Sequence, residues 1–182
     1  CQNTAEISNL KENSNDEEFA GGIVAILETA TIENSKNTGN VIGSTNIGGI
    51  AVENKGKITQ CRNDGQVSKV VGVICKTVNL GGLVGKNGEA ARLSNSKNYG
   101  NVNSETDTLV NLGGICGILY NNSIVELCEN NGAISGSGKE IIPNEDTNTN
   151  CASCTSNNGG SASTDDFGQL NIGIIYGKYQ EI

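Results

Sequence analysis

The amino-acid sequence predicts an all-β fold, a parallel β-helix (β-solenoid) of about five coils with loop insertions. Two short boxes of residues recur along the chain, and the distance between them varies mainly at one place. No stretch shows the apolar pattern of an amphipathic helix over three turns. With 25 glycines, one proline and 3% aromatic residues, the chain suits small stacked units better than a core of large side chains.

The first box reads Gly-Gly-aliphatic. Its copies are Gly21-Gly22-Ile23, Gly48-Gly49-Ile50, Gly81-Gly82-Leu83 and Gly113-Gly114-Ile115, with a degenerate copy at Gly173-Ile174-Ile175. Ile, Val and Leu are frequent around each pair, so the sequence predicts short strands over residues 22–26, 47–52, 82–85 and 114–119.

The second box reads Cys/Ser-x-Asn-x-Gly-x-aliphatic. Its copies begin at Cys1, Ser35, Cys61, Ser96 and Cys128. Asn-x-Gly is a turn signal, because Asn tolerates the left-handed backbone region and Gly takes a positive φ without a steric penalty. The turn residues predicted for the repeats are Asn3, Asn37, Gly39, Asn63, Gly65, Asn98, Gly100, Asn130 and Gly132.

The spacing of the boxes indicates stacked units. From the first Gly of a pair to the next Cys or Ser, the offsets are 14, 13, 15 and 15 residues. From that Cys or Ser to the next Gly pair, they are 20, 13, 20 and 17 residues. Length variation confined to one connection is typical of a solenoid whose insertions emerge on one side. The longer connections are residues 9–20, 68–79 and 103–111.

Stacking would bury aliphatic side chains that a single unit cannot cover. One expected column holds Ile23, Ile50, Leu83 and Ile115, and another holds Ile7, Val41, Val67, Val102 and Ile134. Adjacent coils would lie about 4.8 Å apart, with each strand pairing in parallel with its copies. The five box asparagines would then form a ladder of hydrogen-bonded amides at one corner.

The two boxes together resemble the GLUG repeat, which occurs in tandem in large surface and secreted proteins. The nearest copies are Gly81-Gly82-Leu83-Val84-Gly85 and the segment from Leu93 to Val102. The resemblance covers roughly residues 1–135. It implies a β-helical segment of an adhesin-like protein, and a right-handed coil agrees with the general preference of parallel crossovers. Ala5, Ala25 and Val52 depart from the pattern by replacing box glycines.

The pattern divides the chain into three parts. Residues 1–134 carry the solenoid coils, residues 135–168 are predicted to be a Ser/Asn/Gly-rich loop insertion, and residues 169–182 form a final partial coil. Cys1 is in phase with the repeat, which favours a piece of a longer solenoid over the acylated first residue of a lipoprotein.

The seven cysteines point to packing and stapling rather than to metal chemistry. Cys61 and Cys128 would lie two coils apart, about 9–10 Å, which is too far for a disulfide. Cys116 is expected to be a packed thiol beside Val84. Cys151 and Cys154 form a lone C-x-x-C motif, for which the sequence leaves two interpretations, a disulfide that closes a loop or two free thiols without a role. Zinc would need a second pair or histidines, and the chain has no His.

Composition narrows the function classes. The net charge of −8 disfavours nucleic acid and anionic membrane surfaces as partners, and no apolar run is long enough to insert into a membrane. The acidic runs at residues 15–18 and 165–166 lack the spacing of a calcium loop. Acidic residues are scattered and no catalytic constellation is visible, so we expect no enzyme activity, no cofactor and no metal site.

The sequence therefore predicts a structural role. The expected function is a rigid arm of a cell-surface or secreted protein, with neighbouring repeats or domains of a longer chain as partners and a protein or glycan as surface ligand. A scaffold packed within a larger assembly is the alternative, and a carbohydrate-active β-helix enzyme is a weaker one. The longer connections between boxes are the predicted contact surface.

Overall fold

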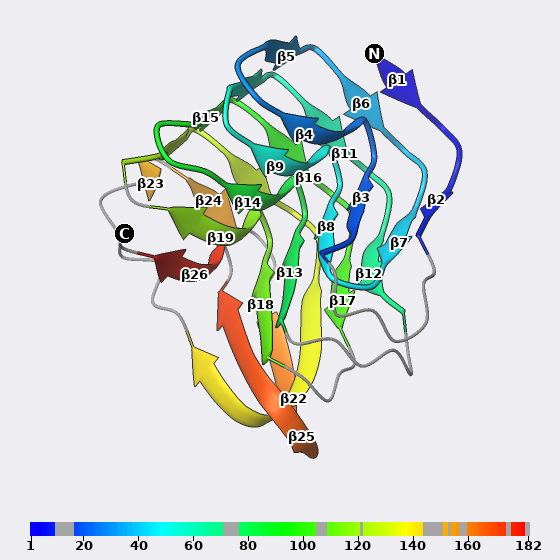
Figure 1. Ribbon diagram of the computed structural model, residues 1–182, viewed down its shortest axis with the longest axis vertical. Coiled ribbons are helices and arrows are strands. Elements are labelled where there is room, and N and C mark those ends of the chain that lie inside the picture. Colours follow the sequence, from blue (N-terminus) through cyan, green and yellow to red (C-terminus); the bar gives the residue numbers. More distant parts are fainter. Residues whose placement is uncertain are drawn as a thin grey trace.

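The computed structural model describes residues 1–9, 17–70, 77–104, 109–120, 122–143, 151–152, 154–156, 160–173 and 176–180 (Figure 1). Within these ranges the chain is all-β, and its short strands pair in parallel with copies of themselves from neighbouring coils. The molecule is therefore a parallel β-solenoid, as the spacing of the boxes predicts.

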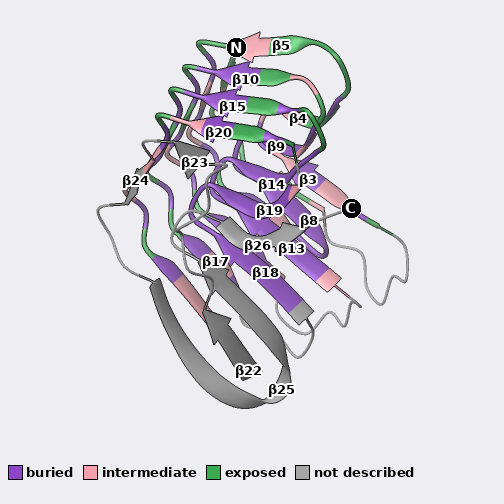
Figure 2. Ribbon diagram, turned by 90° about the vertical axis from the view of Figure 1, so that its left-hand side faces the viewer, coloured by how far each residue is buried: buried purple, intermediate pink, exposed green. Residues whose placement is uncertain are grey.

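Each coil, or rung, contributes one short strand to each of five columns (Figure 2). Column 1 holds β3 (Phe19–Gly21), β8 (Asn46–Gly48), β13 (Thr77–Gly81) and β18 (Leu109–Gly113). Column 2 holds β4 (Val24–Leu27), β9 (Ala51–Asn54), β14 (Val84–Asn87) and β19 (Cys116–Tyr120). Column 3 holds β5 (Thr31–Glu33), β10 (Lys57–Thr59), β15 (Arg92–Ser94) and β20 (Ile124–Glu126).

Columns 4 and 5 contain the second box. Column 4 holds β1 (Gln2–Asn3), β6 (Lys36–Asn37), β11 (Arg62–Asn63), β16 (Lys97–Asn98) and β21 (Glu129–Asn130). Column 5 holds β2 (Ile7–Ser8), β7 (Val41–Gly43), β12 (Val67–Lys69), β17 (Val102–Ser104) and the first half of β22 (Ile134–Pro143). We number the rungs that begin at β3, β8, β13 and β18 as rungs 1 to 4; β1 and β2 precede rung 1.

The register places equivalent box residues on one another. Asn63 pairs with Asn37 on one side and with Asn98 on the other, and Val67 lies between Val41 and Val102 in the same way. A one-residue slip would turn the aliphatic side chains outward, so burial of one strand face fixes this register. The spacing of the boxes thus predicts the register as well as the fold.

In the last rung the chain passes through the five columns in a different order from the earlier rungs. Columns 3, 4 and 5 are filled first, by β23 (Cys151–Ala152), β24 (Thr155–Ser156) and the start of β25 (Gly160–Gly173). The end of β25 then pairs with β18 in column 1, and β26 (Tyr176–Gln180) pairs with β19 in column 2. The second half of β22 pairs on the far side of β25, and Pro143, which has no N–H, lies on this outer strand.

This arrangement differs from the loop insertion predicted over residues 135–168. The described backbone of that segment forms strands that continue the columns. Residues 151–152 pair with residues 125–126 of the rung before, and residues 155–156 pair with residues 129–130. Cys151 stands where aliphatic residues stand in the other copies, and Ser156 stands where Asn stands. The degenerate box hides the repeat from a search for aliphatic and Asn residues.

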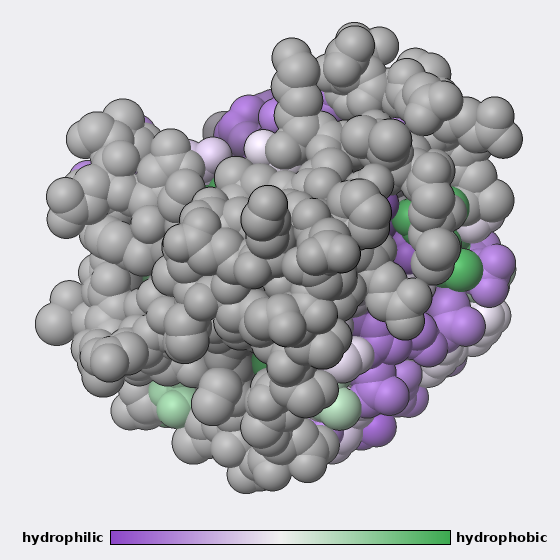
Figure 3. All heavy atoms as spheres, turned by 90° about the horizontal axis from the view of Figure 1, so that it is seen from below, coloured by the Kyte–Doolittle hydropathy of each residue, from purple (hydrophilic) through white to green (hydrophobic). Residues whose placement is uncertain are grey.

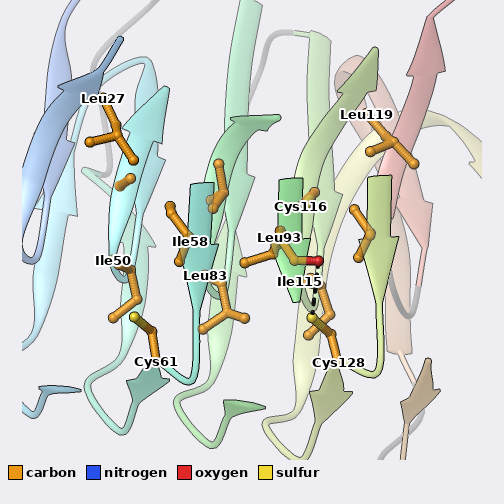
Figure 4. Close-up of a cluster of buried hydrophobic side chains, with 13 residues drawn as sticks. Leu27, Ile50, Ile58, Cys61, Leu83, Leu93, Ile115, Cys116, Leu119 and Cys128 are labelled. Atoms are coloured by element: carbon orange, nitrogen blue, oxygen red, sulfur yellow. Dashed lines mark hydrogen bonds between the residues drawn. The ribbon is translucent and has the colours of Figure 1, made fainter. Parts of the chain in front are cut away.

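The interior contains two hydrophobic clusters. Core 1 lies between columns 2, 3 and 4 and includes Ile50, Leu83 and Ile115, with Ile23 packed against it (Figure 4). Core 2 lies between columns 1 and 5; it includes Val41, Val67, Val102 and Ile134, with Ile7 packed against it. Both predicted aliphatic columns are therefore confirmed.

The predicted asparagine ladder is present and runs inside the solenoid. Asn37 Nδ2 donates to Asn63 Oδ1 at 2.8 Å, Asn63 to Asn98 at 2.9 Å and Asn98 to Asn130 at 2.8 Å. Asn3 donates to Asn37 at 2.8 Å in the same direction. The amides of rungs 1 to 4 are fully buried, and each also donates to the carbonyl of the Gly two residues later. Buried amides are thereby paired with one another and with the backbone.

The glycines of both boxes are required by close approach rather than by positive φ, which corrects the reason that the sequence suggested. A β-carbon on Gly65 would lie 1.9 Å from the carbonyl oxygen of Gly39, and one on Gly100 would lie 1.9 Å from that of Gly65. No left-handed backbone occurs at the box glycines whose surroundings are described, which are Gly21, Gly22, Gly39, Gly48, Gly49, Gly65, Gly81, Gly82, Gly100 and Gly132. Ala5 replaces Gly on the first strand pair, where the residue is exposed at the end of its sheet.

Of the six non-glycine residues with positive φ in the described ranges, Ala90 and Asn122 lie between columns 2 and 3, and the other four lie at the corner between columns 3 and 4. Asn34, Gln60, Asn95 and Leu127, each just before the Cys or Ser of the box, have φ between 48° and 52°. Asn adopts this conformation readily, whereas Leu and Gln do not. The Gly-Gly pairs, in turn, lie at or next to the corner between columns 1 and 2, so the strands predicted across residues 47–52 are interrupted there.

Candidate binding surface

The three longer connections leave the solenoid at one corner, between column 5 and column 1. They join β2 to β3, β12 to β13 and β17 to β18, and residues 10–16, 71–76 and 105–108 within them lie outside the described residues. The same connection from β7 to β8 is a two-residue turn at Ser44 and Thr45. The prediction that these segments emerge on one side is confirmed by the described strands that flank them. We call this edge of the molecule the insertion corner.

A buried polar network supports the insertion corner. The backbone N–H of Glu18 donates to Thr45 Oγ1 at 2.7 Å, and the Thr45 hydroxyl donates to the Glu18 carbonyl at 2.7 Å. Asn46 Nδ2 also donates to Thr45 Oγ1, at 3.3 Å. Thr45 therefore ties the residue that ends the first connection to the tight turn of the next rung, and the end of that connection is held in place.

A second asparagine ladder lies beside this network. Asn111 Nδ2 donates to Asn79 Oδ1 at 2.7 Å, and Asn79 Nδ2 donates to Asn46 Oδ1 at 2.7 Å. All three side chains are buried. The donors point toward earlier rungs, which is opposite to the first ladder. Sequence reasoning missed this ladder, although Asn46, Asn79 and Asn111 each stand two residues before a Gly-Gly pair.

An ion pair also links the first connection to a distant rung. Lys86 Nζ in β14 lies 2.9 Å from Glu17 Oε1, which precedes β3. The Lys86 side chain is only 11% exposed, whereas that of Glu17 is 66% exposed. The pair therefore fixes the end of the first connection against rung 3, with its carboxylate still facing solvent.

Figure 3 views the molecule from below, where most described residues at the surface are hydrophilic.

The outer face of column 4 carries a stack of cations. Lys36, Arg62 and Lys97 lie one above another in register. Asp64 Oδ2 lies 2.9 Å from Lys36 Nζ, and Asp64 Oδ1 lies 2.5 Å from Arg62 Nε. Glu129 Oε2 lies 2.8 Å from Lys97 Nζ. Like charges at neighbouring positions repel one another, and these carboxylates offset the repulsion.

Titration behaviour agrees with this pairing. Partial burial acts to raise the pKa of Asp64, but hydrogen bonds from Arg62 and Lys36 outweigh it and lower the pKa below its ordinary value. The hydrogen bond with Glu129 raises the pKa of Lys97. The Arg62 guanidinium lies 4.3 Å from the centre of the Tyr99 ring, which is 39% exposed. This face is a compensated charge network with one aromatic ring, so it is a weaker candidate for binding than the insertion corner.

The buried cysteines of the described ranges are free thiols, and Cys154 is in a disulfide. Cys61, Cys116 and Cys128 are free and buried, and Cys61 and Cys128 do not pair. Cys116 pairs in register with Val84 and packs in core 1, as expected. Cys154 is disulfide-bonded. The side chain of Cys151 lies outside the described residues, so its bond with Cys154 stays a prediction.

The described residues offer neither a metal-binding cluster nor a membrane-spanning helix. Among the described residues, no three or more His, Cys, Asp or Glu side chains gather where they could hold a metal ion. No helix in the described ranges is long and apolar enough to cross a bilayer. The acidic run at residues 15–18 is described only at Glu17 and Glu18, and the side chains of residues 165–166 lie outside the description.

Comparison with known proteins yields no matching family model, no matching curated protein and no matching solved structure. The resemblance to the GLUG repeat therefore stays a prediction.

Proposed function

We propose that this chain is a non-catalytic β-solenoid segment of a larger cell-surface or secreted protein, a rigid arm that presents loops for binding to a protein or glycan. The observation that carries the proposal is the insertion corner. Three connections of different length leave from the same two columns, while the fourth is a two-residue turn. Since the rungs stack in register in all four cases, the scaffold tolerates any of these lengths.

Rigidity is supported by the interior. Two asparagine ladders run along the axis, and aliphatic columns pack on both sides of the first ladder. Each rung is held by its neighbours alone, so stiffness along the axis grows with each added interface. An arm of this kind holds its loops at fixed spacing, and less entropy is lost when several loops contact one ligand.

A place within a longer solenoid is supported by burial at rung 1. Ile23 and Ile32 are partly exposed, whereas their counterparts in rung 2, Ile50 and Ile58, are fully buried. Further repeats or a capping domain would cover these side chains, in keeping with the GLUG-like pattern. The large apolar residues exposed in the described part of the chain are Ile26, Tyr99, Ile124 and Leu127. They do not form the extensive flank that a scaffold buried in an assembly would need, so we favour the arm.

The proposal can be tested by changing the loops without changing the scaffold. Residues 10–16, 71–76 and 105–108 are replaced together by Gly/Ser sequences of equal length. Residues 88–90, which join columns 2 and 3, are replaced in the same way as the control. Binding is measured by interferometry on surfaces coated with mucin, collagen, fibronectin and a panel of polysaccharides, and melting temperature is recorded for each variant.

We expect the unmodified chain to bind at least one surface, and the loop variant to lose at least tenfold in affinity with little change in melting temperature. The control should bind as the unmodified chain does. Equal binding by the loop variant, or no binding to any of these surfaces by the unmodified chain, would contradict the proposal.

A further inference from the structure

Cys and Ser alternate at one position of the solenoid. Column 4 is preceded in successive rungs by Cys1, Ser35, Cys61, Ser96 and Cys128. The side chains are held alike: the Ser96 hydroxyl donates to the Ser94 carbonyl at 2.8 Å, and the thiols of Cys61 and Cys128 donate to the carbonyls two residues earlier at 3.3 and 3.4 Å. Thiol and hydroxyl are interchangeable in this setting.

The alternation keeps the thiols apart until the last rung. Cys61 and Cys128 lie two rungs, about 9.6 Å, from each other, which is beyond the reach of a disulfide. In the last rung, however, Thr155 pairs in register with Glu129, and this places Cys154 opposite Cys128. Neighbouring rungs are about 4.8 Å apart, within the Cα separation of 4.4–6.8 Å that a disulfide needs. Cys128 is part of core 1 and Cys154 packs against it.

A free thiol therefore lies one rung from a sulfur that is already oxidised, because Cys154 is disulfide-bonded and Cys128 is not. The sequence predicts Cys151 as the partner of Cys154, and β23 places Cys151 in register with Val125 on the neighbouring column. We propose that Cys128 exchanges with this disulfide and forms a second, alternative bond with Cys154. The bond would tie the last rung covalently to rung 4.

The exchange needs no outside oxidant. The Cys128 thiolate attacks Cys154 Sγ, the new Cys128–Cys154 bond forms, and the original partner sulfur leaves as a thiolate that takes up the proton. The number of disulfides is unchanged. The product disulfide joins rung 4 to the last rung, whereas the original disulfide closes a short loop. The former partner of Cys154 becomes a free, reactive thiol.

Burial makes the exchange slow near neutral pH. It raises the pKa of Cys128 to about 12, although backbone hydrogen bonds from this corner act in the other direction. The titratable groups that face this thiol are Cys116 from β19 and Glu126 from β20. Cys154, which packs against the same core, is disulfide-bonded and does not titrate. The reactive species is the thiolate, and below the pKa its fraction increases about tenfold for each unit by which the pH is raised. The rate of exchange should therefore increase about tenfold per pH unit as the solution is made more alkaline.

The experiment uses the full chain with its disulfide intact. The protein is incubated at pH 8 and at pH 9, quenched with acid, and mapped without reduction by tandem mass spectrometry. We expect a Cys128–Cys154 link that accumulates about ten times faster at pH 9. Cys128→Ser, which places the residue of the alternate rungs at this position, should abolish the link and keep the circular dichroism spectrum. Cys61→Ser should leave its rate unchanged.

Two results would overturn the proposal. One is the absence of the Cys128–Cys154 link at both values of pH. The other is linkage of Cys154 to Cys1 or Cys61 at a comparable rate, because this would show exchange through unfolded chains rather than through the stacked register.

Discussion

Gly82 lies directly against Asn98: a β-carbon on Gly82 would stand 2.3 Å from Asn98 Nδ2. Gly49 and Asn63 are related in the same way in the rung before. The two boxes that recur in the sequence are thus the two sides of one contact. The second glycine of the pair gives the amide room, and the amide in turn fills the space between core 1 and core 2.

Replacement of Gly82 by Ala should destabilise the fold strongly. The added methyl group would meet both the Asn98 amide and the Gly114 carbonyl, which lies 2.1 Å from the β-carbon position. Overpacking of this kind costs about 1–3 kcal/mol, and displacement of a buried ladder amide adds to it. Urea denaturation of Gly82→Ala measures the loss. Gly88→Ala is the control, because the nearest atom to its β-carbon position is 3.0 Å away. Equal stability of the two variants would refute the contact argument.

The sequence predicts the columns, the register and the first ladder because these depend on residues that repeat at fixed offsets. It also predicts the side on which the insertions leave. It does not predict the left-handed corner, since Gln60 and Leu127 replace Asn there in two of the four copies. The last rung also escapes prediction, because Cys151 and Ser156 stand in place of an aliphatic residue and the ladder Asn. The order in which the chain fills the columns of the last rung depends on pairing between distant segments, and local sequence patterns do not determine that pairing.

A third, shorter asparagine ladder ends at a leucine, which cannot accept a hydrogen bond from the last amide. Asn54 Nδ2 donates to Asn87 Oδ1 at 2.8 Å, but the buried Asn87 Nδ2 has no partner among the described residues, since Leu119 follows it in register. Leu119→Ala should cost about 2–5 kcal/mol by leaving a cavity. Leu119→Asn should cost about 1–2 kcal/mol less than Leu119→Ala, because its amide oxygen can accept from Asn87. Thermal unfolding of both variants checks the order, and a less stable Leu119→Asn would contradict it.

Leu127 is an exposed residue in an unfavourable backbone conformation. Its φ is 51° and its side chain is 55% exposed. Asn34 and Asn95 occupy the same corner in other rungs. Leu127→Asn should therefore stabilise the protein by about 1 kcal/mol, since a left-handed backbone costs roughly this amount for a branched side chain. Asn95→Leu is the reciprocal variant and should lose a similar amount. Chemical denaturation measures both. A loss of stability in Leu127→Asn, or a gain in Asn95→Leu, would show that this corner does not control stability.

Buried thiols should make stability fall in alkaline solution. Burial raises the pKa of Cys61, of Cys116 and of Cys128 above the ordinary value of 9.0, to about 12 for Cys128. A thiol whose folded pKa is raised contributes fully below pH 9, and its contribution declines as pH rises from there toward the folded pKa. For Cys128 the decline is about 1.4 kcal/mol per pH unit between the ordinary pKa and the folded pKa.

The contribution of one thiol can be isolated by comparing the unmodified chain with Cys128→Ser. Between pH 9.5 and 11, the unmodified chain should lose about 1.4 kcal/mol more per pH unit than the variant, as measured by urea midpoints. Between pH 6 and 8 the two should show the same pH dependence. Parallel curves across the whole range would mean that Cys128 is not buried in the folded protein.

The stacked register is the central claim, and Val102 tests it most directly. Val102 is fully buried between Val67 and Ile134 in column 5, whereas its neighbour Asn103 faces outward and its Oδ1 accepts from Ser135 at 2.6 Å. Thermal unfolding of Val102→Asp should show the loss of the cooperative transition, because an unpaired buried carboxylate costs several kcal/mol. Asn103→Asp should melt within about 3 °C of the unmodified chain, as surface substitutions usually do. If Val102→Asp melted as the unmodified chain does, the stacked core would be wrong.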